Sequence, residues 1–586
     1  MNAKLGIHDV IVGNSDLTNG RVQSSPARRT LDFSWWMVMA ATVLGAVIRI
    51  LYQKGRSFTG DEVGTLIFMN STPAYILTHY GAWLSMNYYI LSLKGLAHVF
   101  GMNPWVLTAP SLAGNIAAIP LTYLVGKRFA PARIAAMGAV IVAFNPYVIE
   151  FAPLIRAYST HLAFSLLAVL LYLRWRDAKS WRRGLAFAAA ALLLCLDHMV
   201  GVYTIAAIAG LEAVCLAREF RSLRWRALDA RWSLLIPMLG VAAILAVTVA
   251  LYHEQLKLTN AQFTRPPPGN VTYLVPMFSF FFGGDFSGFA YAILMLAGCV
   301  AVIKLRLVRA EATVFLCTPV ILMALQGVSH LPSAFARFDI AMVPYCALLV
   351  AAGICFIFDQ IPFGAWLGWI MCVILLGSFS TPALIAMQRE KEEHQWSRVD
   401  KYLASTVHPG DLVVGSILDV ISVAGVLLEN GAPPVREIKE VDSRPFAVDS
   451  IMGPQSFQGS HITLFTVPPL TQLDDNFFAN HKVYFIASDL HVRTDTPQQK
   501  EGRISVLTYS GTKTEVLDKM ASDLASATNN RRDPALITYY LMLQNLSQVL
   551  NRPTDAEHYR AMSLDCVIRL EHRWQAIPYE LPGTYG

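Results

Sequence analysis

The chain has 586 residues, of which 54% are hydrophobic and only 15% are charged, and its mean hydropathy is +0.43. Soluble globular proteins carry about 25% charged residues, so the composition excludes an ordinary soluble protein and indicates a polytopic membrane protein. The formal net charge of +6 comes mostly from arginines in short loops and does not indicate binding to nucleic acid.

Apolar runs predict the organisation of the chain. Segment 1–34 lacks the basic-then-apolar order of a signal peptide, and we interpret it as a cytoplasmic tail. The runs that follow match a hydrocarbon core of about 30 Å at 1.5 Å rise per residue. They predict an all-α transmembrane domain at 35–384 with eleven spans, at 35–52, 104–126, 134–150, 159–173, 184–197, 199–217, 232–252, 286–303, 312–329, 338–358 and 361–384.

Basic loops predict the orientation. Four loops rich in Lys and Arg fall on alternate connections, at 126–133, 174–183, 218–231 and 304–309. Such loops face the cytoplasm, so the N-terminus is predicted inside and segment 53–103 outside. An additional span at 84–100 would break this alternation, so that segment is predicted to lie in the outer interface, as is 273–284. An odd number of spans then places the C-terminal part in the periplasm of a bacterium, with the transmembrane domain in the inner membrane.

The sequence after the last span has soluble character. Four β-rich runs bounded by turn residues, "DLVVGS", "HITLFTV", "KVYFIAS" and "RISVLTY", predict a periplasmic α/β domain at 385–510. Helical spacing predicts a periplasmic helical domain at 511–586. Seven of the eight cysteines fall within predicted spans, which leaves Cys566 without a partner for an intramolecular disulfide.

Polar residues of both signs gather at the predicted outer ends of the spans. Ionisable groups at membrane depth are candidates for a functional site, and arginine beside carboxylates suits a phosphate-bearing lipid substrate. The candidates are Asp61, Glu62, Arg156, Tyr158, Asp197, His198, His330, Arg337 and Asp339.

Each of these residues also fits a structural role when it is taken alone. An Asp-Glu dipeptide is commonly a solvated start of a helix. Arg156 could extend its charge to the interface or pair with Glu150. His198 and His330 fit packing at the interface. The functional interpretation therefore depends on the joint placement of these side chains on one side of the membrane.

Four segments, in order, carry a family resemblance: "SFTGDEVGTLIF", "NYYILSLKGLAHVFG", the stretch from "APSLAGN" to "FAPLIRAYS", and "LDHMVGVY". Together they resemble the polyprenyl-phosphate-sugar-dependent glycosyltransferases of the GT-C fold. This superfamily contains the protein O-mannosyltransferases and the aminoarabinose and galacturonic acid transferases. The resemblance covers about residues 35–210 and extends more loosely to "ARFDIAMVPYCALLVAAG".

The resemblance implies roles for the candidates. Asp61 would be the catalytic base or, with Glu62, part of a site for Mg²⁺ or Mn²⁺. Arg156 would contact the donor phosphate together with Tyr158 and Arg337, and His198 and His330 would be polar residues of the site. The family usually has a histidine or acidic residue before the paired tyrosines, whereas this chain reads "WLSMNYY", which leaves metal dependence open, with His79 a displaced substitute.

The implied reaction moves a monosaccharide from a polyprenyl-phosphate donor to an envelope glycan, lipid or protein, with inversion at the anomeric carbon. A carboxylate would take the proton of the acceptor hydroxyl, and an arginine or a metal ion would stabilise the departing phosphate. Alternatives are an oligosaccharide ligase or polymerase with a diphosphate-linked donor, a transporter or flippase, and a non-catalytic scaffold. A transporter would place broken polar helices at the bilayer midplane, which the sequence does not indicate.

Overall fold

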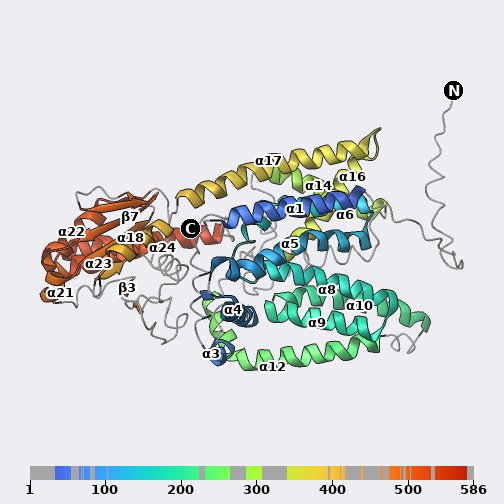
Figure 1. The fold of residues 1–586 in the computed structure, drawn as a ribbon, viewed down its shortest axis with the longest axis horizontal. Coiled ribbons are helices and arrows are strands. Elements are labelled where there is room, and N and C mark those ends of the chain that lie inside the picture. The colour runs from blue at the N-terminus through green and yellow to red at the C-terminus, as the bar shows by residue number, and fades with distance from the viewer. Residues whose placement is uncertain are drawn as a thin grey trace.

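Apolar helices lie side by side in a bundle, and a smaller unit that contains the β-strands lies beyond one end of it (Figure 1). The computed structural model describes residues 33–54, 62, 65–66, 69, 72–79, 86–101, 103–198, 200–223, 231–263, 286–305, 340–393, 396–408, 411–415, 437–439, 463–465, 474–488, 490–491, 496–501, 503–529 and 535–576. The predicted span at 312–329 and the apolar segment at 273–284 lie outside these residues.

The bundle is built from helices in chain order. They are α1 (Phe33–Gln53), α3 (Pro73–His79), α4 (Asn87–Phe100), α5 (Pro104–Phe129), α6 (Ala132–Phe144), α7 (Pro146–Glu150), α8 (Tyr158–Ala178), α9 (Trp181–Asp197), α10 (Gly201–Leu223), α12 (Trp232–Phe263), α14 (Phe286–Leu305), α16 (Val343–Phe358) and α17 (Gly364–Glu393). Within the described residues, every predicted span other than 312–329 falls mainly on helix.

Among the residues that the structure describes, length and composition qualify four helical segments to cross a membrane, at Phe33–Gln53, Pro104–Phe129, Ile340–Phe358 and Gly364–Arg389. Shorter apolar helical segments occur at Ala132–Phe144, Gly201–Ala217, Trp232–Val247 and Phe289–Val302. Among the described residues the chain is thus mostly helical with several apolar helices, as a multi-pass membrane protein requires. The count of eleven spans stays a prediction.

The predicted span 134–150 is two helices. Pro146 has no backbone N–H and occupies the first position of α7, where that group would be unsatisfied in any case. The Asn145 side chain accepts a hydrogen bond from the backbone N–H of Val148 at 3.0 Å, which caps the new helix. The break directs the chain into the loop Phe151–Ala157 that precedes α8.

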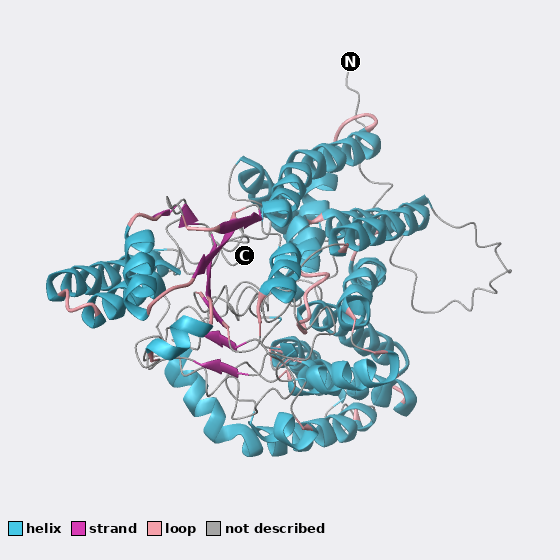
Figure 2. Ribbon diagram, turned by 60° about the vertical axis from the view of Figure 1, so that its left-hand side comes forward, coloured by secondary structure: helices cyan, strands magenta, loops and turns pink. Residues whose placement is uncertain are grey.

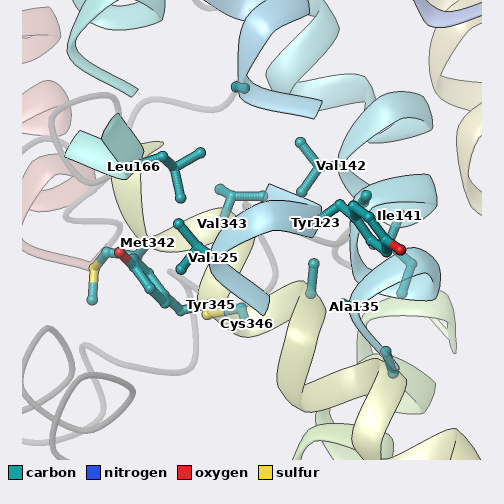
Figure 3. Packing of buried hydrophobic residues seen from close by; sticks show 14 of the residues in the cluster. Tyr123, Val125, Ala135, Ile141, Val142, Leu166, Met342, Val343, Tyr345 and Cys346 are labelled. Carbon is teal, nitrogen blue, oxygen red and sulfur yellow. The ribbon is translucent and has the colours of Figure 1, made fainter. Parts of the chain in front are cut away.

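The bundle core is continuous from α1 to α17. Its buried side chains come mainly from α5, α6, α8 and α16, and Figure 3 shows residues of α5, α6 and α16 packed together. Gly298 of α14 and Gly353 of α16 let these two helices approach closely, because a Cβ on Gly353 would lie 1.9 Å from the backbone oxygen of Leu294. Six described cysteines lie within or beside this core, and none of these six is joined in a disulfide.

Helix α4 corresponds to the segment predicted to lie in the interface. Its Asn87, Tyr89, Ile90 and Leu93 are buried, and the helix packs against α5 and α9. Its end, near Phe100, is exposed. One face of α4 therefore covers the ends of α5 and α9, where the candidate site residues lie.

Ion pairs hold together the end of the bundle where α8 finishes. Arg231, which precedes α12, donates to Glu212 at 2.6 Å and to Glu219 at 3.0 Å, both on α10. The Tyr172 hydroxyl donates to Glu212 at 2.6 Å. This cluster is named the Arg231 cluster. Its member on α8, Tyr172, lies 14 residues after the first residue of the helix, which is about 21 Å along the axis at 1.5 Å per residue.

The C-terminal unit is a mixed sheet covered by helices (Figure 2). Strand order is β2-β3-β1-β4-β7-β6. Strands β2, β3, β1 and β4 are parallel to one another, and β7 is antiparallel to both of its neighbours, β4 and β6. The strands are β1 (Leu412–Val414), β2 (Glu437–Lys439), β3 (Thr463–Phe465), β4 (Val483–Ser488), β6 (Gln498–Glu501) and β7 (Ile504–Tyr509), with a separate pair β5 (Leu490–His491) and β8 (Thr528–Asn529).

The helices of this unit are α18 (Trp396–Thr406), α21 (Asp475–Asn480), α22 (Lys513–Ala525), α23 (Ala535–Val549) and α24 (Pro553–Ala576). The four β-rich runs of the sequence coincide with β1, β3, β4 and β7. Side chains of α22 and α23 pack in the same cluster as those of β4 and β7. The sheet and these helices share one core across the predicted boundary at residue 510, and the division into domains stays a prediction.

Candidate active site

Arg156 lies in the loop between α7 and α8, and its side chain is buried, with a relative exposure of 3%. Its Nη1 donates to the hydroxyl of Thr65 at 3.3 Å. Its backbone oxygen accepts from the hydroxyl of Ser111, on α5, at 3.1 Å. A planar guanidinium removed from bulk water forms strong charge-assisted hydrogen bonds with the oxygens of an anion such as phosphate. Because Arg156 is this deeply buried, its side chain does not extend its charge into the membrane interface.

Glu62 is fully buried and binds the same loop. Its Oε1 accepts the backbone N–H of Ile155 at 2.9 Å. Because Ile155 immediately precedes Arg156, the carboxylate holds the backbone from which the arginine side chain extends. Glu62 is therefore neither a solvated helix start nor remote from Arg156.

Tyr89 of α4 completes this support. Its hydroxyl lies 2.8 Å from the Ser111 hydroxyl. Ser111 gives its single hydroxyl hydrogen to the backbone oxygen of Arg156, so Tyr89 is the donor of the bond between the two hydroxyls. Helix α4, α5 and the loop are thus joined by a chain of hydrogen bonds.

The pKa of the Tyr89 hydroxyl is shifted by burial and by the ionisable groups near it. Burial raises the pKa well above its ordinary value, and the hydrogen bond with Ser111 opposes this. The carboxylates of Asp197 and Glu62 raise the pKa further, whereas the guanidinium of Arg156 lowers it. Two carboxylates and one guanidinium therefore act on a single buried hydroxyl.

Asp197 and His198 follow one another at the end of α9 and both are buried. The Thr160 hydroxyl, in the first turn of α8, donates to Oδ2 of Asp197 at 2.7 Å. The ring of His198 lies 5.4 Å from that of His161 and 5.9 Å from that of Tyr158. The ends of α8 and α9 thus place polar and aromatic groups beside the Arg156 loop.

The predicted site residues divide into two groups. The structure brings together a set at one end of the bundle, namely Glu62, Arg156, Tyr158, Asp197 and His198. Asp61, His330, Arg337 and Asp339 lie outside the described residues. The roles of all these residues stay predictions.

Sequence reasoning missed several polar side chains near the loop, namely Arg49, Tyr89, Ser111, Asn115, Thr160 and His161. One signal was available for Arg49, because it is an ionisable residue inside the predicted span 35–52 and such residues are candidates for function. Ser111, Asn115 and Thr160 carry no signal in the sequence, since small polar residues are common in apolar helices.

The metal expectation rests on Asp61 and Glu62. Within the stretches that the structure describes, no three histidine, cysteine, aspartate or glutamate side chains are grouped as metal ligands. One oxygen of Glu62 is already engaged by a backbone N–H. The residues that are described do not by themselves form a metal site.

A scan against protein-family models gives no match, and a search of the curated proteins gives none either. Solved structures do match, and those reported below are glycosyltransferases of the GT-C fold, the class that the sequence resembles. The likeness is distant in sequence.

Three of these structures illustrate the match. ArnT from Cupriavidus metallidurans, bound to undecaprenyl phosphate, is 12% identical with a TM-score of 0.48, over 81% of this chain and 98% of that one. The oligosaccharyltransferase AglB from Archaeoglobus fulgidus, bound to an inhibitory peptide and a dolichol-phosphate, is 12% identical with a TM-score of 0.43, over 67% and 64%. The S. cerevisiae protein O-mannosyltransferase Pmt1-Pmt2 complex, bound to its sugar donor, is 15% identical with a TM-score of 0.30, over 43% and 37%.

Proposed function

We propose that this protein is a membrane glycosyltransferase that transfers a monosaccharide from a polyprenyl-phosphate donor to a glycan, lipid or protein acceptor of the cell envelope. The reaction takes place on the periplasmic face of a bacterial inner membrane, with inversion at the anomeric carbon. The observation that carries the proposal is the buried guanidinium of Arg156 on a loop that Glu62 and Ser111 hold in place.

The chemistry follows from the charges at the site. The acceptor hydroxyl attacks the anomeric carbon, and its proton passes to the carboxylate of Asp61. The bond between that carbon and the phosphate oxygen breaks, and the phosphate leaves with its electron pair. Arg156 stabilises the negative charge that develops there, which is worth more in a water-poor site than in solution.

The other residues support these two. Glu62 orients the Arg156 loop through the backbone of Ile155. Tyr158 and His198 line the approach to the loop, with Arg337 and His330 as further contacts of the donor. A divalent cation held by Asp61 and Glu62 would supply additional stabilisation of the phosphate charge when bound.

A second candidate is an oligosaccharide ligase or polymerase that uses a diphosphate-linked donor. A buried arginine serves a diphosphate as well as a monophosphate. A transporter or flippase would also need such a phosphate contact, but it would not need a catalytic carboxylate. Catalysis of sugar transfer is therefore the property that separates a glycosyltransferase from a transporter.

The test is transfer of sugar in detergent from a purified polyprenyl-phosphate donor, with Asp61→Asn compared with the unaltered protein. The amide keeps the shape of the carboxylate but cannot take the proton. We expect the turnover rate to fall by about 10²- to 10⁴-fold, while donor binding persists. Turnover by Asp61→Asn at the unaltered rate would remove Asp61 as base, and binding without any transfer by the unaltered protein would favour a transporter.

A further inference from the structure

We infer that Arg49 is a positioning residue for the proposed donor site, acting through Asn115 and Ser159 on the loop that carries Arg156. The inference rests on the proposed role of Arg156 as a phosphate contact. Arg49 lies in α1, near the end of that helix, and it is completely buried. Arg49 acts on the donor only through the loop and makes no contact with the donor itself.

All three nitrogens of the Arg49 guanidinium donate hydrogen bonds to other groups of the protein. Its Nε donates to Oδ1 of Asn115 at 2.5 Å, and its Nη1 donates to the backbone oxygens of Gly45 at 3.0 Å and Ala143 at 2.8 Å. Its Nη2 donates to the backbone oxygen of Val142 at 3.4 Å. All of these acceptors are neutral. A buried cation without an anionic acceptor among these bonds is costly in an apolar helix, which indicates that it serves a particular purpose.

The two carbonyls of α6 explain why a cation is suited to this position. Val142 and Ala143 lie in the last turn of α6, whose final carbonyls have no donor within the helix. The donor for Val142 in a continuous helix would be the backbone N–H of residue 146, which is Pro146 and has none. Positive charge at the C-terminus of a helix is also favoured by the helix dipole. Arg49 therefore stabilises the break between α6 and α7.

Asn115 connects Arg49 of α1 to α7, which follows the break after α6. While its Oδ1 accepts from Arg49, its Nδ2 donates to the backbone oxygen of Val148 at 2.8 Å and to the hydroxyl of Ser159 at 3.0 Å. Both hydrogens and the oxygen of the amide are engaged. The side-chain amide of Asn115 is therefore fixed in one orientation, with its oxygen toward Arg49 and its nitrogen toward Val148 and Ser159.

Ser159 completes the path to the loop. Its hydroxyl donates to the backbone oxygen of Phe151 at 2.7 Å, at the point where the loop begins. The same loop is held four and five residues later at Ile155 and Arg156. Without the path from Arg49, the beginning of the loop loses its anchor, and Arg156 loses part of the constraint on its position.

The alternative is that Arg49 contributes only to folding stability. A matched control is Arg231→Met, which removes a buried arginine from the Arg231 cluster at the opposite end of α8. If the effect of Arg49 were only on stability, Arg49→Met and Arg231→Met would behave alike at temperatures where both proteins are folded. Ser159→Ala is a second, smaller test, because it removes only the last bond of the path.

The experiment measures the affinity of the full-length protein in detergent for a short-chain prenyl phosphate, together with hydrogen exchange of the amides in Phe151–Ala157. We expect Arg49→Met to weaken the affinity at least about tenfold and Ser159→Ala to weaken it by less. In the Arg156→Ala background, Arg49→Met should have little further effect, because residues that act through one another are not additive. Exchange in the loop should rise in Arg49→Met but not in Arg231→Met.

The outcomes separate the inference from the proposed function. If Arg156→Ala leaves the affinity unchanged, the phosphate role of Arg156 is wrong, and the exchange of the loop amides still decides whether Arg49 positions the loop. If Arg156→Ala weakens binding but Arg49→Met and Ser159→Ala do not, the inference about Arg49 is wrong and the proposed function stands. Fully additive losses in the double variant would also overturn the inference.

Discussion

Glu62 Oε1 accepts the backbone N–H of Ile155 at 2.9 Å, so the second carboxylate of the Asp-Glu pair is bonded to the residue that precedes Arg156. This contact joins the segment between α1 and α3 to the loop between α7 and α8. It assigns Glu62 a structural task at the site, which is compatible with the supporting role that the resemblance implies.

Glu62→Gln and Glu62→Ala should therefore differ. The amide oxygen of glutamine can still accept from Ile155, so we expect donor affinity to fall only a few-fold. Alanine leaves a buried backbone N–H without an acceptor, which costs about 1–3 kcal/mol, and both donor affinity and stability should fall. Steady-state transfer kinetics and thermal unfolding of both variants give the comparison.

Chelator treatment of the unaltered protein is the control for a shared metal ion. If Glu62 only positions the loop, chelator leaves transfer unchanged. Loss of transfer that Mg²⁺ or Mn²⁺ restores, with Glu62→Gln as inactive as Asp61→Asn, would assign Glu62 to a metal site instead.

Replacement of Arg156 should affect binding more than folding. Arg156→Ala removes a charge-assisted contact from a poorly hydrated site, and we expect the Kd for the donor to rise at least about tenfold. Arg156→Lys should recover only part of this, because a point charge cannot reproduce the planar fork. Equal affinity in both variants and the unaltered protein, measured by equilibrium binding, would leave Arg156 with no role at the donor phosphate.

Reporter fusions test the orientation predicted from the basic loops. Fusions after residues 178, 225 and 308 should report the cytoplasm, and one after residue 390 should report the periplasm. The Arg231 cluster and the Arg156 loop lie at opposite ends of α8, so the same experiment decides which side of the membrane holds the site. A cytoplasmic signal at 390 would move the site to the other face.

Gly114→Ala should disturb the site through packing. A Cβ at this position of α5 would lie 2.8 Å from the backbone oxygen of Ser159 and 3.0 Å from Cα of Thr160, so α5 and α8 must separate. We expect stability to fall by about 1–3 kcal/mol and donor affinity to fall with it. Gly240→Ala in α12 is the control, since its Cβ would meet no atom within 4 Å. Equal stability of the two variants in thermal unfolding would contradict the close contact.

Much of the architecture could be predicted from local patterns. The hydrocarbon core requires long apolar helices, and runs such as 35–52 and 104–126 reappear as α1 and α5. β-rich runs bounded by turn residues likewise predict the segments that form β1, β3, β4 and β7. Glu62 and Arg156 stood out because charges at the ends of apolar runs are rare.

Only the tertiary structure decided how these parts meet. Ile155 and Glu62 are 93 residues apart, and Arg49 and Asn115 are 66 apart. A hydrogen bond over such a separation leaves no periodicity in the sequence, because it depends on how helices pack and not on the residues beside it. The break at Pro146 shows the same limit, since the apolar run 134–150 has the length of one span, whereas the structure divides it into α6 and α7. Composition and periodicity thus determined that helices form and where charges could gather, whereas packing determined which charge holds which loop.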